Sequence, residues 1–501
     1  MNTILLEPSD VLFFRDGRPM SGSSVGHGAA WPLPTVTNAA LHAALWRAGL
    51  AREAHTHART VQGERQTSTE RFGSLATVGP FPVRADGDEE TWLFPRPLDA
   101  MVCLPEEHAH AEGGGKQGEN PKELKRGSIR TTASPQPLLE GSCSSLPLPL
   151  HAAATGPPSK EESAPWWSRE AWQAYLDGKT DSASQATNQC AFDRCFSASE
   201  ATIGIGIDPE TGTQDQTRLY SAHYLRLRPD WKLGLFAAMS EKTEVRGERI
   251  DLLQKLLEEH GSILVGGQQR TCSTTRKPSG GNLPLPIGRA DNFAQCDLAL
   301  PDCDSSFPRF LVKWILLAPA VYPAISAGEK DGRAILPHRG GWLPNWISDG
   351  DGYRVLLRSP IEARNPAEES RAAYRERVRT APSIAARLVA ATVGKPVPVT
   401  GWSLGTPDLE SEDGHARRGG AKPTHLAVPA GSVYYFACDS ADDATALAAA
   451  LNWHGKVEAS VTAASSPFST IRNRRSTLFG EKGFGLGVCG TWEYCPPGET
   501  P

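Results

Sequence analysis

Residues 5–19 of the chain read LLEPSDVLFFRDGRP, and this stretch with the segments after it sets the order of the first elements. Residues 4–7 have a strand pattern, and a polar loop with Arg15, Asp16 and Arg18 then runs through Gly and Ser residues to position 28. After PLPT at 32–35, apolar residues recur at i,i+4 up to Arg47, before Gly49, which predicts a helix. The chain therefore begins with a strand, an arginine-bearing loop and a helix.

Strand and helix patterns continue to about residue 305. We expect extended segments around 75–84 and 91–98, strands at 201–207, 219–227 and 231–238, an amphipathic helix at about 249–260, and a strand from 262. The stretch from about 105 to 190 is predicted to be a mobile insertion, because it is rich in Gly, Pro, Ser, Glu and Lys up to Pro165. Trp166, Trp167 and Trp172 near its end are expected in a core, with the anchoring of a neighbour as the alternative.

A second unit is expected to start near Phe310 with an apolar strand. It continues with a helical stretch near 385–391, a strand at 432–437, and an alanine-rich helix to Leu451 that begins with the S-x-x-D capping signature at Ser440. A terminal strand reaches Tyr494. This order predicts an α+β protein of two ferredoxin-like (RRM-like) units with long insertions, one over residues 1–305 and one over residues 306–501 that ends in a glycine-rich loop.

Composition limits the classes of function. The 501 residues include 52 Lys and Arg against 57 Asp and Glu, so a formal charge of -5 excludes a protein that coats nucleic acid by bulk charge, and any such contact is local. The ten cysteines show no C-x2-C spacing, and we expect reduced structural thiols with no metal and no cofactor. The N-terminus lacks a signal-peptide pattern and the longest apolar run, 314–325, contains two prolines, so a cytoplasmic protein without a membrane partner is expected.

Most of the candidate phosphate-binding residues lie near the C-terminus. Four glycines occur between Gly480 and Gly487, where they permit positive φ and exposed amides that hold a phosphate, or merely allow a tight turn. Lys482 and the cluster Arg472, Arg474 and Arg475 favour phosphate binding, although a solvated basic face is the alternative. Arg15 and Arg18 have the same ambiguity, since they either grip RNA or pair with Asp16.

The segment at 5–19, with the PLPT at 32–35 and its helix, resembles the N-terminal signature of the third subunit of the type III-B (Cmr) CRISPR effector, a family in the RAMP superfamily. Three further segments are similar to the same family. They are residues 203–208 with Leu219-Tyr220, residues 401–402 with 422–423 and 428–434, and the terminal Gly-Phe-Gly-Leu-Gly loop. The chain departs from the pattern in the long insertion and at Gly266-Gly267-Gln268-Gln269-Arg270, which puts a role for Arg270 in doubt.

The resemblance implies a non-catalytic subunit that holds the 5′ handle of the guide RNA (crRNA) and contacts the large polymerase-like subunit and the first backbone RAMP subunit. It meets target RNA only indirectly. The arginine loop and the glycine loop are implied to embrace the handle together. The RNA-binding residues expected on this basis are Arg15, Arg18, His27, Asn38, Arg472, Arg474, Arg475, Lys482, Gly483, Phe484, Gly485, Leu486 and Gly487.

Two other functions stay open. The first is a RAMP endoribonuclease that processes precursor crRNA by general acid/base attack of a 2′-hydroxyl, with His27 or His42 as the histidine that such chemistry needs. The second is the equivalent handle-binding subunit of a type III-A complex, which the large subunit that co-purifies would reveal. The chain has neither a His-Asp doublet nor a Gly-Gly-Asp-Asp motif, which is compatible with a passive role.

Overall fold

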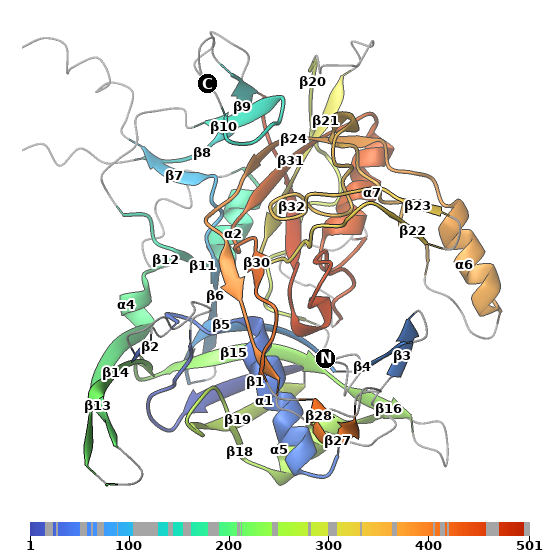
Figure 1. Cartoon of the computed structure of the whole chain (residues 1–501). Coiled ribbons are helices and arrows are strands. Elements are labelled where there is room, and N and C mark those ends of the chain that lie inside the picture. The colour runs from blue at the N-terminus through green and yellow to red at the C-terminus, as the bar shows by residue number, and fades with distance from the viewer. Residues whose placement is uncertain are drawn as a thin grey trace, which may run out of the picture.

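The structure is a computed structural model of the chain (Figure 1). It describes residues 1–15, 24–26, 29–50, 58–61, 64–67, 75–87, 89–103, 129–138, 144–153, 162–178, 190–207, 211, 213–242, 249–278, 282–298, 308–330, 333–362, 368–403, 406–410, 416–417, 420–456 and 470–494. Helices and strands are mixed in two main sheets, so the expected α+β class is confirmed.

The first sheet is eight-stranded, in the order β12-β11-β6-β5-β15-β1-β19-β18. Its strands are β1 (Asn2–Pro8), β5 (Ala76–Asp86), β6 (Glu89–Pro95), β11 (Trp166–Ser168), β12 (Cys190–Ala191), β15 (Trp231–Ala238), β18 (Ser262–Leu264) and β19 (Thr271–Pro278). β1 lies antiparallel between β15 and β19, with Leu5 opposite Gly234 on one side and Thr275 on the other. Since side chains alternate along a strand, Ile4 and Leu6 face one way and Leu5 faces the other.

Two helices cover the face that carries Ile4 and Leu6. They are α1 (Pro34–Arg47), with proline at its first turn, and α5 (Leu252–Glu259), whose N-cap Asp251 accepts hydrogen bonds from the amides of Leu253 and Gln254. Both caps follow the usual helix start signals. The helices and this face share one core, with Leu41, Leu45 and Leu256 among its members. The helix predicted at 35–47 and that predicted at about 249–260 are therefore both present.

The second sheet is five-stranded. Its strands are β20 (Ala294–Cys296), β21 (Arg309–Leu316), β24 (Ala386–Thr392), β31 (Val433–Cys438) and β32 (Gly487–Thr491), and β21 pairs with β20, β31 and β32. α7 (Ala441–Leu451) covers one face, with Ala444, Leu447 and Leu451 in a core with Trp314 and Phe436. The Ser440 hydroxyl accepts a hydrogen bond from the Asp443 amide, as the capping signature predicts.

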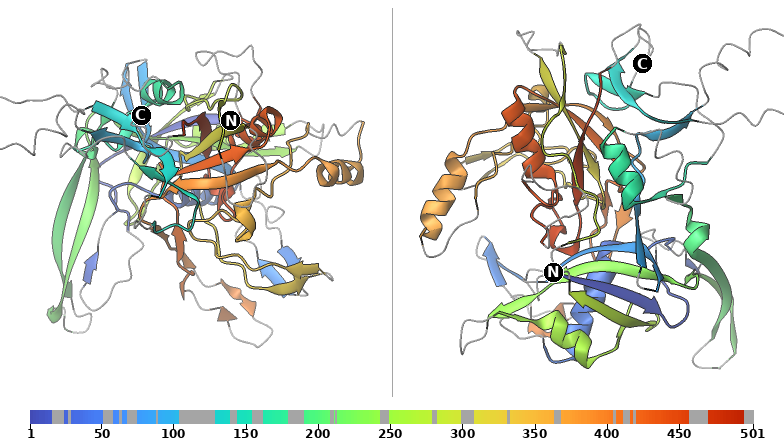
Figure 2. Two further views of the ribbon diagram at one scale, coloured as in Figure 1. Left: turned by 90° about the horizontal axis from the view of Figure 1, so that it is seen from above. Right: turned by 180° about the vertical axis from the view of Figure 1, so that it is seen from behind.

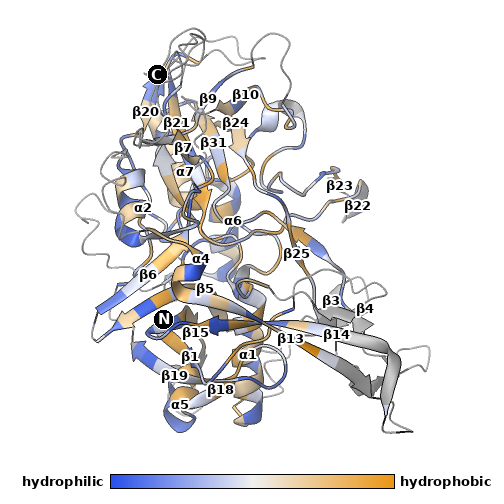
Figure 3. Ribbon diagram, turned by 90° about the vertical axis from the view of Figure 1, so that its left-hand side faces the viewer, coloured by the Kyte–Doolittle hydropathy of each residue, from blue (hydrophilic) through white to orange (hydrophobic). Residues whose placement is uncertain are grey.

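The faces opposite the helices join the two units in one interior. A single buried cluster contains Leu5 and Phe236 of the first sheet, Ile315 and Tyr435 of the second, and Trp172 of α2 (Arg169–Leu176). Figure 3 shows that apolar residues concentrate in the central strands of both units. The open faces are therefore buried against each other in the central strands, whereas the face of β19 keeps Ser273, Thr275 and Lys277 exposed.

Two sequence expectations need correction. The mobile insertion expected at about 105–190 does not extend over 162–178, because β11 and α2 belong to the core, with Trp167 and Trp172 buried and Trp166 half-buried. Residues 104–128, 139–143, 154–161 and 179–189 lie outside the described residues. The helix expected near 385–391 is wrong, because this segment is strand β24, whose buried Leu388 pairs with Phe436 of β31. Sheet pairing overrides the helix propensity of its alanines.

Smaller elements extend from this body (Figures 1 and 2). The long hairpin of β13 (Ser197–Ile207) and β14 (Gln214–Leu227) projects at one side, and helix α6 (Arg371–Thr380) projects at the other. The remaining elements are β2 (Ser24–Gly26), β3 (Ala58–Val61), β4 (Glu64–Thr67), β7 (Ala100–Cys103), β8 (Ile129–Thr132), β9 (Ser134–Pro137), β10 (Leu150–Ala153), α4 (Asp193–Phe196), β16 (Ser240–Lys242), β17 (Arg249–Asp251), β22 (Gly328–Lys330), β23 (Arg333–Ile335), η5 (Asp351–Tyr353), β25 (Val397–Val399), β26 (Trp402–Ser403), β27 (Thr406–Glu410), β28 (Ala416–Arg417), β29 (Gly420–Ala421), β30 (His425–Ala427) and η6 (Gly480–Lys482).

Candidate nucleic-acid interface

The glycine-rich segment uses its amides internally. The Lys482 amide donates to the Phe479 carbonyl at 2.9 Å, the Gly483 amide to the Gly480 carbonyl at 3.0 Å, and the Gly485 amide to the Pro319 carbonyl at 2.7 Å. Phe484 and Leu486 are fully buried. In this conformation these amides are not available to a phosphate, so the geometry favours the tight-turn alternative for the glycines.

The same segment docks on the N-terminal unit. Gly483 has φ of +99°, and a Cβ there would lie 2.9 Å from the Thr77 carbonyl oxygen of β5. Phe484 shares a small core with Leu33, which directly precedes α1. The C-terminal segment thus meets α1 and β5 of the N-terminal unit (Figure 1), whereas most of the arginine loop lies outside the described residues.

Lys482 is the most prominent cation at this junction. Its ammonium lies 4.9 Å from the centroid of the Phe479 ring, which in turn contacts the His425 ring. Burial lowers the pKa of Lys482, Glu481 opposes that shift, and the charge of Lys422 adds to it. Burial, followed by the charge of Lys482, lowers the pKa of His42 to about 4. Cations and aromatic rings therefore share this surface, the combination that phosphates and bases require.

The three arginines at 472, 474 and 475 differ in their exposure and in their hydrogen bonds. The Nε of Arg475 donates to the Ala450 carbonyl in the last turn of α7 at 2.7 Å, so this residue closes the helix end. Arg474 is half-buried, its Nε has no hydrogen-bond partner, and burial lowers its pKa to about 10 against the opposing charge of Glu481. Arg472 is exposed. Arg475 thus has a structural hydrogen bond through its Nε, whereas the exposed Arg472 and the unpartnered Nε of Arg474 are the better candidates for a ligand.

The N-terminal candidates are only partly described. Arg15 is exposed at the start of the arginine loop, and the Ala29 amide donates to the Phe14 carbonyl at 2.9 Å, which closes the base of that loop. Arg18 and His27 lie outside the described residues. Asn38 is buried, and its amide donates to the Thr77 hydroxyl at 3.1 Å, so it ties α1 to β5 and does not reach a surface.

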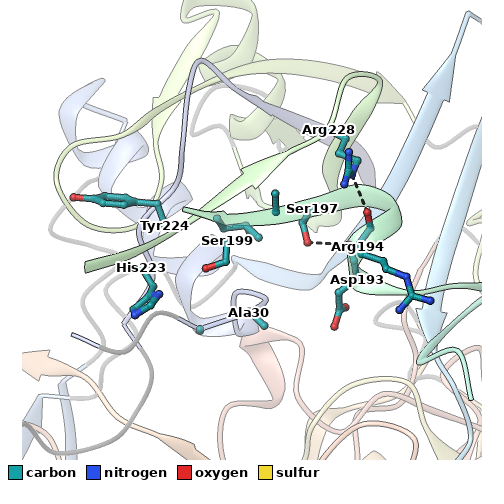
Figure 4. A pocket seen from close by; sticks show the side chains of 11 residues that line it. Ala30, Asp193, Arg194, Ser197, Ser199, His223, Tyr224 and Arg228 are labelled. Atoms are coloured by element: carbon teal, nitrogen blue, oxygen red, sulfur yellow. Dashed lines mark hydrogen bonds between the residues drawn. The ribbon is translucent and has the colours of Figure 1, made fainter. Parts of the chain in front are cut away.

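A cavity of about 520 Å³ that the sequence did not predict lies at Ala29, where the arginine loop ends. Ala29 and Ala30 line it together with Arg194, His223 and Arg228 from α4 and the base of the β13–β14 hairpin (Figure 4). The Nε of Arg228 donates to the Arg194 carbonyl at 2.8 Å, which orients its guanidinium. The available signal was the Y-x-R-x-R spacing from Tyr224 to Arg228, which indicates aromatic and basic groups on one side of an extended chain, although Arg226 pairs with Glu200 and does not line the cavity.

The segment between Ala29 and Leu33 connects the two basic sites. Ala29 lines the cavity, and Leu33 packs against the small core that contains Phe484. Between them, the Trp31 indole nitrogen donates to the Pro80 carbonyl at 3.0 Å. The cavity and the Lys482 junction therefore lie at the two ends of one short stretch that leads from the arginine loop into α1.

The family model for CRISPR-associated protein (Cas_Cmr3) matches residues 4–287 and 343–492, which is most of the chain. The chain belongs to this family. The resemblance to the third subunit of the type III-B (Cmr) effector in the RAMP superfamily is thereby confirmed. No curated protein matches the chain.

Two solved structures similar to this Cas_Cmr3 chain are chains of the type III-B Cmr-beta complex. One was determined by cryo-EM bound to cognate target RNA and AMPPnP in state 1, at 10% identity and a TM-score of 0.34. The other was determined bound to cognate target RNA, at 11% identity and a TM-score of 0.34. Both similarities cover 86% of this chain and 86% of the other.

The departure from the family pattern at 266–270 has a local role in this Cas_Cmr3 chain. The guanidinium of Arg270 lies 5.2 Å from the Tyr224 ring centroid and 3.5 Å from the Asp10 carboxylate. Arg270 therefore ties the hairpin base to the loop after β1. Within the described ranges, no three His, Cys, Asp or Glu side chains cluster as a metal site would need, and no helix is long and apolar enough to cross a membrane.

Proposed function

We propose that this subunit binds the 5′ handle of the crRNA without catalysing a reaction, and bridges the large polymerase-like subunit to the backbone RAMP subunit. The observation that carries the proposal is the docking of Lys482 and its loop on Thr77 and Leu33. This docking sets a cation from the C-terminus beside the exit of the N-terminal arginine loop. Single-stranded RNA needs such local cations with aromatic faces, which a chain of net negative charge can still supply.

We further propose that both units are ferredoxin-like. In the first, the elements β1, α1, β5, β15, α5 and β19 follow a βαββαβ order, with the strands arranged β19-β1-β15-β5. In the second, β32, β21, β31 and β24 have the equivalent arrangement, although none of the residues of α6 before β24 is buried. Because the central strands of the open sheet faces are buried against each other, we expect RNA to bind the loops at the junction and not the middle of a sheet.

The path of the handle runs from the cavity to the Lys482 junction. Arg194 and Arg228 lie at one end, and Lys482, Lys422 and Phe479 lie at the other. Phosphate at the second end stabilises the protonated ammonium of Lys482, whose pKa burial lowers in the free protein. Affinity for the handle therefore falls as salt screens these contacts.

The endoribonuclease remains the rival function, and the position of His42 beside Lys482 is the observation that favours it. With a pKa of about 4, His42 is neutral near pH 7 and can accept a proton, but it is a weak general base because its pKa lies well below that pH. Cleavage by 2′-hydroxyl attack also needs a general acid, which a neutral histidine of this pKa does not provide at pH 7. The scaffold is therefore the function that we prefer.

The test compares Lys482→Ala and Arg15→Ala with Lys255→Ala, an exposed cation on α5 away from the junction. Each of the first two variants should bind a handle-bearing guide about tenfold more weakly, the loss of one charge-assisted hydrogen bond, with a salt slope shallower by about 0.7. A guide without the handle should show little difference among the variants. Equal losses for both guides would refute handle recognition.

The same mixtures decide between scaffold and nuclease. Precursor RNA incubated with the wild-type protein should stay intact on a denaturing gel. Cleavage that disappears in His42→Gln would establish the nuclease instead. The large subunit that co-purifies with the tagged chain provides the control for the type III-A alternative.

A further inference from the structure

Helix α6 buries none of its residues against the rest of the chain that the structure describes. None of the residues of this 10-residue helix is buried, and it projects from the second unit in both views of the molecule (Figures 1 and 2). Short helices are marginal in water, and in folded proteins they are normally stabilised by the core on which an apolar face packs. α6 has no such face, so only local interactions and an external partner can hold it.

The local interactions of α6 involve part of its charge. The Ser370 hydroxyl accepts a hydrogen bond from the Ala373 amide at 3.1 Å and caps the first turn. Arg377 makes two hydrogen bonds of 3.0 Å to the Glu369 carboxylate and lies over the Tyr374 ring. Arg379 pairs with Glu376. Two of the four arginines of the helix are thus neutralised by carboxylates.

The other two arginines of the helix have no partner among the described residues. Arg371 and Arg375 are exposed, and neither has an ion-pair or hydrogen-bond partner among the residues that the structure describes. They are four residues apart, so they lie on the same face of the helix, about 6 Å apart along its axis. This face therefore presents two positive charges without a described partner on a helix that projects from a protein of net charge -5.

We propose that the Arg371–Arg375 face of α6 binds the phosphate backbone of RNA without regard to sequence, and that α6 becomes fully ordered on binding. Arginine-rich segments that fold on RNA behave in this way. A protein partner fits the face less well, because interfaces need an apolar centre, and α6 offers only Val378 beside a Tyr374 ring that Arg377 already covers. The inference rests on the proposal that the subunit binds RNA, but not on recognition of the handle.

The experiment uses the full chain with the double substitution Arg371→Ala/Arg375→Ala, since alanine keeps the helix propensity of the segment. The matched control is Arg47→Ala/Lys255→Ala, which removes two exposed charges from α1 and α5. Affinity for guide RNA is measured across a salt series, with and without the handle. The α6 variant should lose affinity for both RNAs equally, with a salt slope shallower by about 1.4, whereas the control should follow the wild type.

Hydrogen exchange of the α6 amides supplies a second measurement. The wild-type amides from Tyr374 to Ala381 should exchange rapidly in the free protein and become protected on addition of RNA. If wild-type protein binds RNA but the α6 variant binds it equally well, this inference is wrong and the proposed function stands. If wild-type protein binds no RNA, both fail. Unchanged RNA binding with loss of a co-purifying partner subunit assigns α6 to a protein contact and also refutes the inference.

Discussion

Gly485 was expected to bind RNA, but its surroundings indicate a structural role. A Cβ at this position would lie 2.0 Å from the Ser476 amide nitrogen, and φ is +73°. We therefore predict that Gly485→Ala destabilises the fold itself, so this position does not test RNA binding cleanly. Gly341 is the matched control, because its φ is +65° but nothing lies within 4 Å of an added Cβ.

Backbone strain alone should cost Gly341→Ala about 1–2 kcal/mol, and Gly485→Ala should lose clearly more, because its neighbour is backbone that cannot move aside. Thermal unfolding of both purified variants measures the difference. Equal losses would show that the 476–485 contact relaxes easily, and the loop would again be a candidate for direct contact with RNA.

The sequence indicated the chemistry of the C-terminal residues, but not how the fold uses it. Glycines and arginines at 472–487 predict either a phosphate cradle or a tight turn. The choice depends on which carbonyls the amides reach, and Pro319, the acceptor of the Gly485 amide, is far away in sequence. In the same way, the Nε of Arg475 is hydrogen-bonded to the Ala450 carbonyl at the end of α7. Lys482 stays an RNA-binding candidate, because its ammonium lies over the Phe479 ring and no ion pair holds it among the described residues.

Helices with a clear start signal in the sequence were predicted correctly, whereas segments with weaker signals were not. α1 and α7 carry proline or S-x-x-D start signals, and both were predicted with nearly their observed limits. The alanine-rich segment at 386–392 has helix-forming residues, yet pairing with β31 makes it a strand. α2 was missed because it lies within a stretch of low apolar content, although its Trp172 is fully buried.

The N-caps of α2 and α6 allow one prediction about these elements. Ser168 accepts from the Ala171 amide and Ser370 from the Ala373 amide, so the same substitution to alanine removes the same kind of cap. Ser168→Ala should lower the global unfolding free energy by about 1 kcal/mol or more, because α2 is part of the core. Ser370→Ala should leave global unfolding unchanged and only speed hydrogen exchange within α6. A comparable global loss in both variants would show that α6 is coupled to the core.

For the whole molecule, one buried polar network links the two units. Asp99, after β6, accepts hydrogen bonds from the hydroxyl of Tyr175 at 2.7 and 2.8 Å, from Tyr435 at 3.2 Å, and from the Lys313 ammonium at 3.2 Å. These residues come from both units and from α2, and Lys313 also lies 4.0 Å from the Tyr175 ring centroid. The network therefore adds a polar link to the apolar interior that joins the two units, and with it supports the junction where we place the RNA.

Substitution of Asp99 tests this dependence. Asp99→Asn leaves the buried ammonium of Lys313 without its counter-charge, which should destabilise the protein by about 3–5 kcal/mol near pH 7, whereas the double variant Asp99→Asn/Lys313→Met should recover much of the loss.

Burial already lowers the pKa of Lys313, and Asp99 opposes that shift, so the substitution lowers the pKa further. Between the folded pKa and that of a free lysine, about 10.4, the unfolded chain binds the extra proton, so stability rises with pH in this window. The deficit of Asp99→Asn should accordingly shrink as pH is raised from 7 towards 10 in thermal unfolding, while the double variant follows the wild type more closely. A deficit that is independent of pH, or equal in the single and double variants, would mean that Asp99 acts through its tyrosine hydrogen bonds and not through the charge of Lys313.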